Sequence, residues 1–114
     1  MSICATIGKP VYTGFDVCIH DGFVVFENLK GSKEYLFYFL QFIEKRWYKY
    51  GQSGIQLNLN SDIVSNEKIN LPSIPEQKKI GSFLSSLDQE IEHAGQQIEK
   101  MQDWKKALLQ KLLI

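Results

Sequence analysis

The stretch "LPSIPEQKKIG", residues 71–81, marks the point where the character of the chain changes. Ser73 lies three positions before Glu76, the spacing of a capping box, in which the serine oxygen accepts from the amide at the third helical position and the glutamate reaches back. Pro75 falls in the first turn, where its missing N–H is no loss, and Pro72 disfavours helix upstream. The sequence therefore predicts a helix that begins sharply here, with Ser73 and Glu76 as its cap.

Beyond this junction, apolar residues recur at alternating steps of four and three. This 3.5-residue repeat, with Lys105 in the one polar position, persists for more than four heptads and is typical of a coiled coil. A helix from Glu76 to the C-terminus would be roughly 58 Å long at about 1.5 Å per residue, too long for the head to bury along one edge. We therefore expect a second helix to cover the predicted dimer seam, which consists of Ile80, Leu84, Leu87, Ile91, Ala94, Ile98, Met101, Leu108 and Leu112.

The middle of the predicted helix is its weakest part. Gly95 costs about 1 kcal/mol relative to alanine in a helix and, together with Ala94, leaves a thin place in the seam. The alternative interpretation is a helix that packs along its own head domain. Such a helix usually has a wider apolar stripe and a shorter length than this one.

The residues before the junction favour a mixed head. "ICATIGKPVY" and "DVCIHDGFVVFEN" are rich in β-branched and aromatic residues and contain turn-forming glycines, so residues 1–30 are predicted to form strands. Ser32 is predicted to cap a helix over residues 33–50, and a short strand is expected at residues 68–71. The predicted fold class is therefore α+β, with a small mixed head at residues 1–71 and one long coiled-coil helix at residues 72–114.

Composition excludes several classes of protein. Thirteen basic and thirteen acidic residues cancel, so any DNA contact must come from a local patch. Cys4 and Cys18 lack the spacing of a zinc site or a disulfide framework, and His20 and His93 are far apart, so no metal site is expected. The densest apolar segment, "YLFYFLQFI", is about half the length of a membrane span, and no signal peptide is visible. A cytoplasmic chain is expected.

One local patch has the composition of a nucleic-acid contact. The segment "EKRWYKYGQSG", residues 44–54, interleaves cations with aromatic residues beside a loop of amides and hydroxyls. Cations position phosphates, while amides and hydroxyls can read base edges. The alternative is a solvated helix end, and Trp47 and Tyr48 are expected in the core in either case. The candidate DNA-binding residues are Lys45, Arg46, Lys49, Tyr50, Gln52, Ser53, Gln56 and Asn58.

No combination of residues forms a convincing catalytic centre. Glu76-Gln77-Lys78 has the E-x-K spacing of some nuclease sites, but those sites need a strand, and Glu76 has a simpler role as a cap partner. Gly51 and Gly54 lack the lysine and the following helix of a phosphate-binding loop. We expect a non-enzymatic chain with no cofactor.

The junction and its helix resemble the conserved region of type I restriction-modification specificity subunits. In that family, a target recognition domain runs into a Leu-Pro-x-x-x-Glu-Gln-x-x-Ile segment and then a long helix. "ATIGKPVY" and "GQSGIQLNLN" are similar to the later part of such a recognition domain, and "WKKALLQKLL" to the end of the helix. The resemblance covers nearly the whole chain. The matching residues at the junction are Leu71, Pro72, Glu76, Gln77, Ile80, Leu84, Leu87, Asp88 and Ile91.

This resemblance implies recognition of double-stranded DNA and assembly with modification (methyltransferase) subunits. Because methyl transfer and cleavage belong to other subunits in the family, S-adenosylmethionine is not expected to bind this chain. Family members usually carry two recognition domains and two helices that pair antiparallel as a spacer, whereas this chain has one helix and the latter half of one recognition domain. We therefore expect a partial subunit that forms a homodimer through its helix, antiparallel in the preferred arrangement and parallel in the alternative.

Two questions stay open at this point. The truncated head could serve only as a cap, which would make the chain an assembly module that does not bind DNA. Trp104 is either a packing residue beside the seam or an anchor for a modification subunit.

Overall fold

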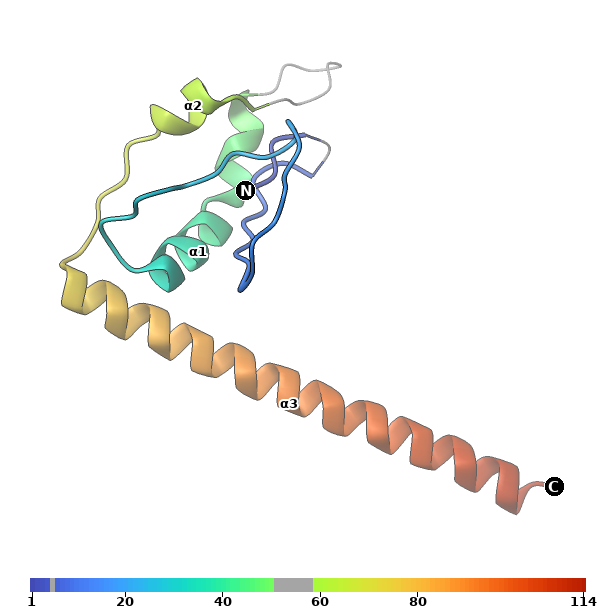
Figure 1. Ribbon diagram of the computed structural model, residues 1–114. Helices are drawn as coiled ribbons and strands as arrows, with labels where there is room; N and C mark the ends of the chain where they lie inside the picture. Colours follow the sequence, from blue (N-terminus) through green and yellow to red (C-terminus); the bar gives the residue numbers. More distant parts are fainter. Residues whose placement is uncertain (5, 51–58) are drawn as a thin grey trace. The chain divides into compact units, whose positions relative to one another are not determined.

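The computed structural model describes residues 1–4, 6–50 and 59–114. Its elements follow in the order α1 (Lys33–Phe42), the 3-10 segment η1 (Glu44–Tyr50), α2 (Ser61–Ser65) and α3 (Ile74–Leu112), as Figure 1 shows. The chain divides into two compact units, residues 1–81 and residues 82–114. The first two turns of α3 therefore belong to the head unit, and the rest of α3 forms the second unit by itself.

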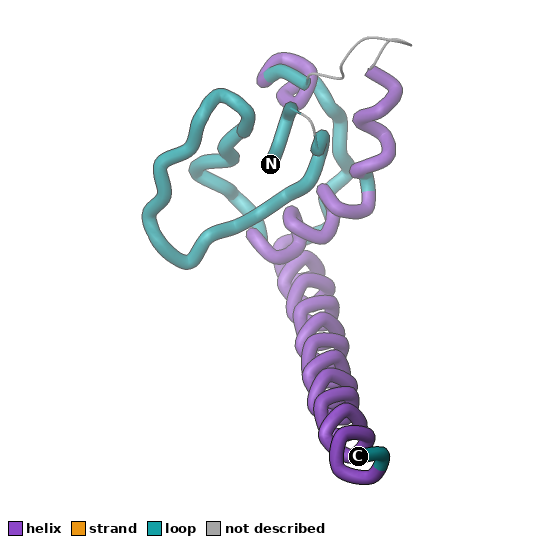
Figure 2. Tube along the Cα trace, turned by 90° about the vertical axis from the view of Figure 1, so that its right-hand side faces the viewer, coloured by secondary structure: helices purple, strands orange, loops and turns teal. Residues whose placement is uncertain are grey.

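The described part of residues 1–30 forms extended loops, drawn in teal in Figure 2, so the predicted α+β class is wrong. Within the described residues, β-pairing is limited to an isolated antiparallel bridge between Ser2 and Phe23. Backbone hydrogen bonds extend this contact on both sides, from the amide of Ile3 to Gly22 (2.9 Å) and from the amide of Val24 to Met1 (2.9 Å). The strand expected at residues 68–71 is also a loop.

The physical reason lies in the nature of β-propensity. β-branched and aromatic residues favour a strand only where a neighbouring strand pairs with the backbone and other side chains cover the pleated face. Here several side chains of the expected strands stay exposed instead of packing in a sheet. They are Val11, Tyr12, Phe15, Val17, Ile19 and Val25.

Helix α1 begins where the sequence predicts and ends earlier. The hydroxyl oxygen of Ser32 accepts from the amide of Tyr35 (3.2 Å), which is the expected cap. The predicted single helix over residues 33–50 is divided, because α1 ends at Phe42 and the chain continues as the tighter η1. The change of winding still brings Ile43 and Trp47 into the core.

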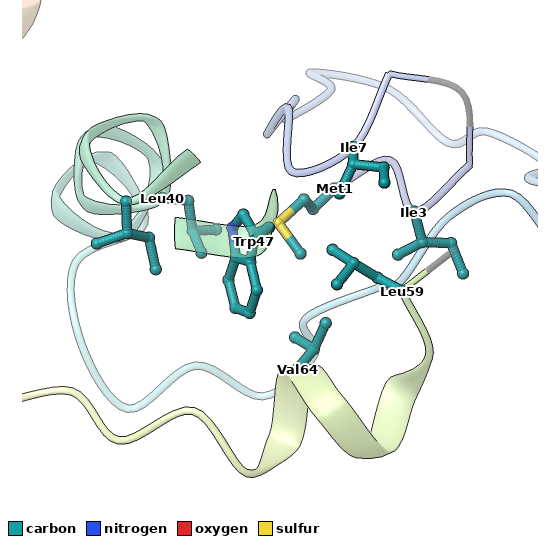
Figure 3. Packing of buried hydrophobic residues seen from close by; sticks show 8 residues of the cluster. Met1, Ile3, Ile7, Leu40, Trp47, Leu59 and Val64 are labelled. Carbon is teal, nitrogen blue, oxygen red and sulfur yellow. The ribbon is translucent and has the colours of Figure 1, made fainter. Parts of the chain in front are cut away.

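The core of the head gathers residues from the N-terminal segment, α1, η1 and α2 and from the chain beside these helices, as Figure 3 shows. Trp47 is at its centre and only 1% exposed. Gly8, with φ +78°, lies directly against the indole ring, and a Cβ added there would overlap Trp47 Cδ1. The buried apolar residues are Met1, Ile3, Ile7, Leu40, Ile43, Trp47, Leu59 and Val64.

The start of α3 is fixed to the start of α1 through Gln77. This side chain is 4% exposed, and its Oε1 accepts from the amide of Ser32 (3.1 Å) while its Nε2 donates to the carbonyl of Pro72 (2.8 Å). One turn later, a Cβ added at Gly81 would lie 2.8 Å from the Cβ of Glu34, so the two helices approach too closely for any side chain there. The head therefore holds the first two turns of α3 in a defined position.

Candidate functional site

The junction residues Ser73 and Glu76 form a local network at the start of α3. The carboxylate of Glu76 accepts from the Ser73 amide (2.9 Å) and from the Ser73 hydroxyl (2.6 Å). These hydrogen bonds, the hydroxyl bond first, lower the pKa of Glu76, because they favour the ionised form. The glutamate thus reaches back to the residue before the helix, and the negative charge lies at the positive end of the helix dipole.

The seam on α3 is open to solvent within the single chain. The buried residues of this helix are Gln77 and Gly81, both in its first two turns. Further along, Ile91 is 68% exposed, Ile98 60% and Leu112 72%. Leu87, Ala94 and Met101 are exposed as well, and Leu84 and Leu108 are half-buried. A row of apolar side chains at coiled-coil spacing thus lacks a covering surface.

Aromatic side chains border this seam. Phe83 and Trp104, which are both largely exposed, directly precede the seam residues Leu84 and Lys105. In a coiled coil this is the flanking position next to the apolar core. Trp104 can therefore rest against a partner helix and still present one face to another protein.

The basic patch lies on η1, where Lys45, Arg46, Lys49 and Tyr50 are all exposed. Arg46 stacks its guanidinium over the Phe42 ring at 5.7 Å from the centroid, and this contact orients the cation without neutralising it. Lys45 and Arg46 are the exposed cations of this segment that can meet a phosphate directly.

Lys49 and Tyr50 are tied to Glu67, a residue that the sequence did not single out. The Tyr50 hydroxyl donates to Glu67 Oε2 (3.0 Å), and Lys49 Nζ lies 3.6 Å from the same oxygen. The pKa of Lys49 is raised, chiefly by its hydrogen bond with the Tyr50 side chain and further by the Glu67 carboxylate. A phosphate would have to compete with Glu67 for this lysine. The sequence does not predict the contact of Glu67 with Lys49 and Tyr50, because Glu67 lies beyond α2, a different element from η1.

The remaining candidate residues of the patch, Gln52, Ser53, Gln56 and Asn58, lie outside the described residues. Of the two aromatic residues expected in the core, Trp47 is buried as predicted, whereas Tyr48 is exposed. In a 3-10 helix, residues three apart share a face, so the exposed Tyr48 lies on the same side of η1 as Lys45. Aromatic rings beside cations suit a nucleic-acid contact.

The head also carries an apolar hollow of about 780 Å³ that sequence reasoning missed. It lies between the extended segments of residues 10–29 and helix α1. Its lining includes Val11, Tyr12, Phe26, Leu36 and Phe37, and the rings of Tyr12 and Phe37 meet edge to face at 5.1 Å. Most of the residues that line it come from the two segments that were predicted to form strands.

Among the described residues, no group of three or more His, Cys, Asp or Glu side chains is arranged to hold a metal ion. Cys4 and Cys18 are exposed free thiols. None of the helices in the described part of the chain combines the length and the apolarity needed to cross a membrane.

Comparison with known proteins places the chain in a family. Residues 1–101 match the family described as "Type I restriction modification DNA specificity domain". The chain is also 27% identical, over 118 aligned positions, to a protein of Methanocaldococcus jannaschii named as a candidate specificity subunit of the type I restriction enzyme MjaX. That alignment covers 99% of this chain and 27% of the relative, so the chain spans about a quarter of that protein's length. No solved structure matches the chain significantly.

Proposed function

This chain belongs to the family of type I restriction-modification DNA specificity domains, and on that basis we propose that it acts as a non-catalytic DNA-recognition component of such a system. In this proposal the head contacts double-stranded DNA, and α3 joins two copies of the chain into an antiparallel homodimer. The dimer then binds modification subunits, which carry out methyl transfer.

The observation that carries the proposal is the extent of the family match. It covers residues 1–101, which include the whole head and most of α3. Both parts that the function needs, a surface for DNA and a helix for assembly, thus lie inside the matched region. The exposed Lys45, Arg46 and Tyr48 on η1 support a DNA contact, and the open seam of α3 supports pairing with another helix.

A second function is favoured by the contact at Glu67. Because this carboxylate occupies Lys49 and Tyr50, the described patch retains fewer free cations than its sequence suggests. An assembly module would use α3 and the flanking Trp104 to dock on modification or specificity subunits without a DNA contact of its own.

The ionic strength dependence of DNA binding separates the two functions. The purified chain is titrated with a labelled random-sequence duplex at increasing salt concentration, and fluorescence anisotropy reports binding. A recognition component binds at low salt, and its affinity falls steeply as salt rises, because each neutralised phosphate releases counterions. No binding at the lowest salt concentration would favour the assembly module.

Sequence readout is tested at Gln52 and Gln56. Enriched duplexes are first selected from a randomised pool, and a Gln52→Ala, Gln56→Ala double variant is then compared with a Lys45→Ala variant. The double variant should weaken the selected site more than random DNA, whereas Lys45→Ala should weaken both equally. Equal losses in the double variant would assign Gln52 and Gln56 to phosphate positioning.

A further inference from the structure

We propose that α3 pairs with α3 of a second copy in one particular antiparallel register, in which Ala94 faces the partner's Lys105. This inference rests on the homodimer proposed above and specifies its geometry. It follows from the two irregular positions of an otherwise apolar seam, the small Ala94 with Gly95 and the charged Lys105, and from the charges beside the seam.

A parallel arrangement in register brings each seam residue against its own counterpart. The two Lys105 ammonium groups would then meet in one layer of the apolar core, where like charges repel and are poorly solvated. The two Ala94 residues would meet in another layer, next to two glycines, and leave unfilled space. In a parallel dimer each irregular residue therefore meets its own copy, and neither residue offsets the unfavourable free energy of the other.

An antiparallel arrangement lets the two irregular positions compensate. In the proposed register, the long Lys105 side chain lies over the partner's Ala94 and Gly95, fills the thin place with its methylene stem and extends its ammonium to solvent. Every other layer of the overlap pairs apolar residues. These layers are Leu87 with the partner's Leu112, Ile91 with the partner's Leu108, and Ile98 with the partner's Met101.

Charges beside the seam select the same register. Glu90 and Lys111 are exposed and directly precede the seam residues Ile91 and Leu112, so they share one flanking position of the heptad. In the proposed register, Glu90 lies next to the partner's Lys111. Helical side chains lean toward the N-terminus of their own helix, so in antiparallel helices these two lean toward each other.

Registers shifted by one heptad lose both features. One shift places Lys105 against the partner's Leu87 and Glu90 beside the partner's Trp104. The other shift places Lys105 against the partner's Met101 and Lys111 beside the partner's Gln97. Neither shift lets a small residue accommodate the lysine, and neither pairs opposite charges.

Cysteine cross-linking of the full chain tests the register. In a Cys4→Ser, Cys18→Ser background, which removes both native thiols, chains carrying Ala94→Cys are mixed with chains carrying Lys105→Cys and oxidised mildly. We expect rapid formation of a covalent dimer of the two different chains and none from either variant alone. Asp103→Cys, on the side of α3 opposite the seam, is the matched control and should cross-link with neither.

Three other outcomes are informative. A cross-link from Ala94→Cys alone would show a parallel pair, and a preference of Lys105→Cys for Leu87→Cys or Met101→Cys would show a shifted register; either result overturns the inference while the dimer stands. Sedimentation equilibrium of the same background chain distinguishes these cases from failure of the dimer itself, which would appear as a monomer and would overturn both proposals.

A charge exchange provides a second test that does not need cysteines. Glu90→Lys should raise the dimer Kd about 2- to 20-fold, because two flanking pairs become repulsive. Lys111→Glu should do the same, and the double exchange should restore the Kd to within about twofold of the unmodified chain. Losses that add in the double variant would mean that the two residues do not meet, and would overturn the register.

Discussion

The head and the long part of α3 are organised by different physics. From Ser82 onward, α3 forms a unit by itself, and its backbone hydrogen bonds join residues four apart in the sequence. The head has short helices, extended loops and a small core built from residues far apart in sequence. The comparison shows that a helix can be regular along its whole length and still leave its apolar residues exposed, as the seam of α3 does. The predictions below test this contrast, beginning with the largest effect.

A charge in the seam should abolish pairing and spare the head. Leu87→Asp or Ile91→Asp places a carboxylate in an apolar interface at two symmetric positions, so we expect the dimer Kd to rise at least about 100-fold. Sedimentation equilibrium measures the change. Gln89→Asp, on the exposed side of α3, is the matched control and should stay dimeric. Dimers that persist in both seam variants would mean that the heptads serve the head instead.

An added methyl group at Gly8 should destabilise the head and spare α3. Gly8 combines φ +78° with direct contact to Trp47, so Gly8→Ala is expected to cost about 1–3 kcal/mol. Denaturation followed by tryptophan fluorescence, in a Trp104→Phe background that leaves Trp47 as the remaining tryptophan, reports on the head. Gly14→Ala is the control, because a Cβ there would meet no atom within 4 Å. Equal effects of the two substitutions would refute the packing at Gly8.

Within the head, Gln77 joins the start of α3 to the start of α1, and its loss should destabilise the head. Gln77→Ala leaves the buried amide of Ser32 without its acceptor, which typically costs about 1–3 kcal/mol. The free energy of unfolding of the head, measured in denaturant, checks this. Gln89→Ala, which removes an exposed glutamine from the same helix, should change it little. If both variants are equally stable, the start of α3 is held by other contacts.

The smallest expected effect concerns pH at the first turn of α3. The pKa of Glu76 is lowered in the folded chain by its hydrogen bonds with Ser73, so its stabilising contribution is present above the unfolded value of 4.5 and is lost as pH falls through the folded pKa. Hydrogen exchange at the Ser73 amide, which donates to Glu76, should therefore show less protection in this acidic range.

Glu76→Gln is the control for that measurement. An amide side chain does not titrate here, so the extra acid-dependent loss of protection at Ser73 should disappear while the general pH dependence of exchange remains. A profile that is unchanged in this variant would assign the effect to another group.

The difference between head and helix also explains which features of the structure could be predicted from the sequence. The start of α3 shortly after Pro72 and the Ser32 cap of α1 could be predicted, because prolines, caps and heptads act within a few residues. The family could be inferred from the junction for the same reason, since its motif is contiguous. The seam was visible as a pattern, and its exposure agrees with the need for a partner.

The rest depended on contacts between distant residues. β-rich segments at residues 11–29 stay as loops because a strand needs pairing from elsewhere, which its own sequence does not supply. Tyr48 was expected in the core together with Trp47, but adjacent side chains of the helical segment η1 point in different directions, so Trp47 is buried and Tyr48 is exposed. Glu67 and Gln77 gained their roles only when the chain brought Lys49 and Ser32 to them.

The sequence by itself thus determined the long helix, its sharp start, its 3.5-residue seam and the net neutrality of the chain, because these depend on local hydrogen bonds, spacing and composition. Only the tertiary structure decided that the head is helical and loop-rich, that Gln77 fixes the start of α3 to α1, and that Glu67 holds part of the basic patch. The physical reason is that burial and pairing are properties of two surfaces in contact, and a sequence pattern describes only one of them at a time.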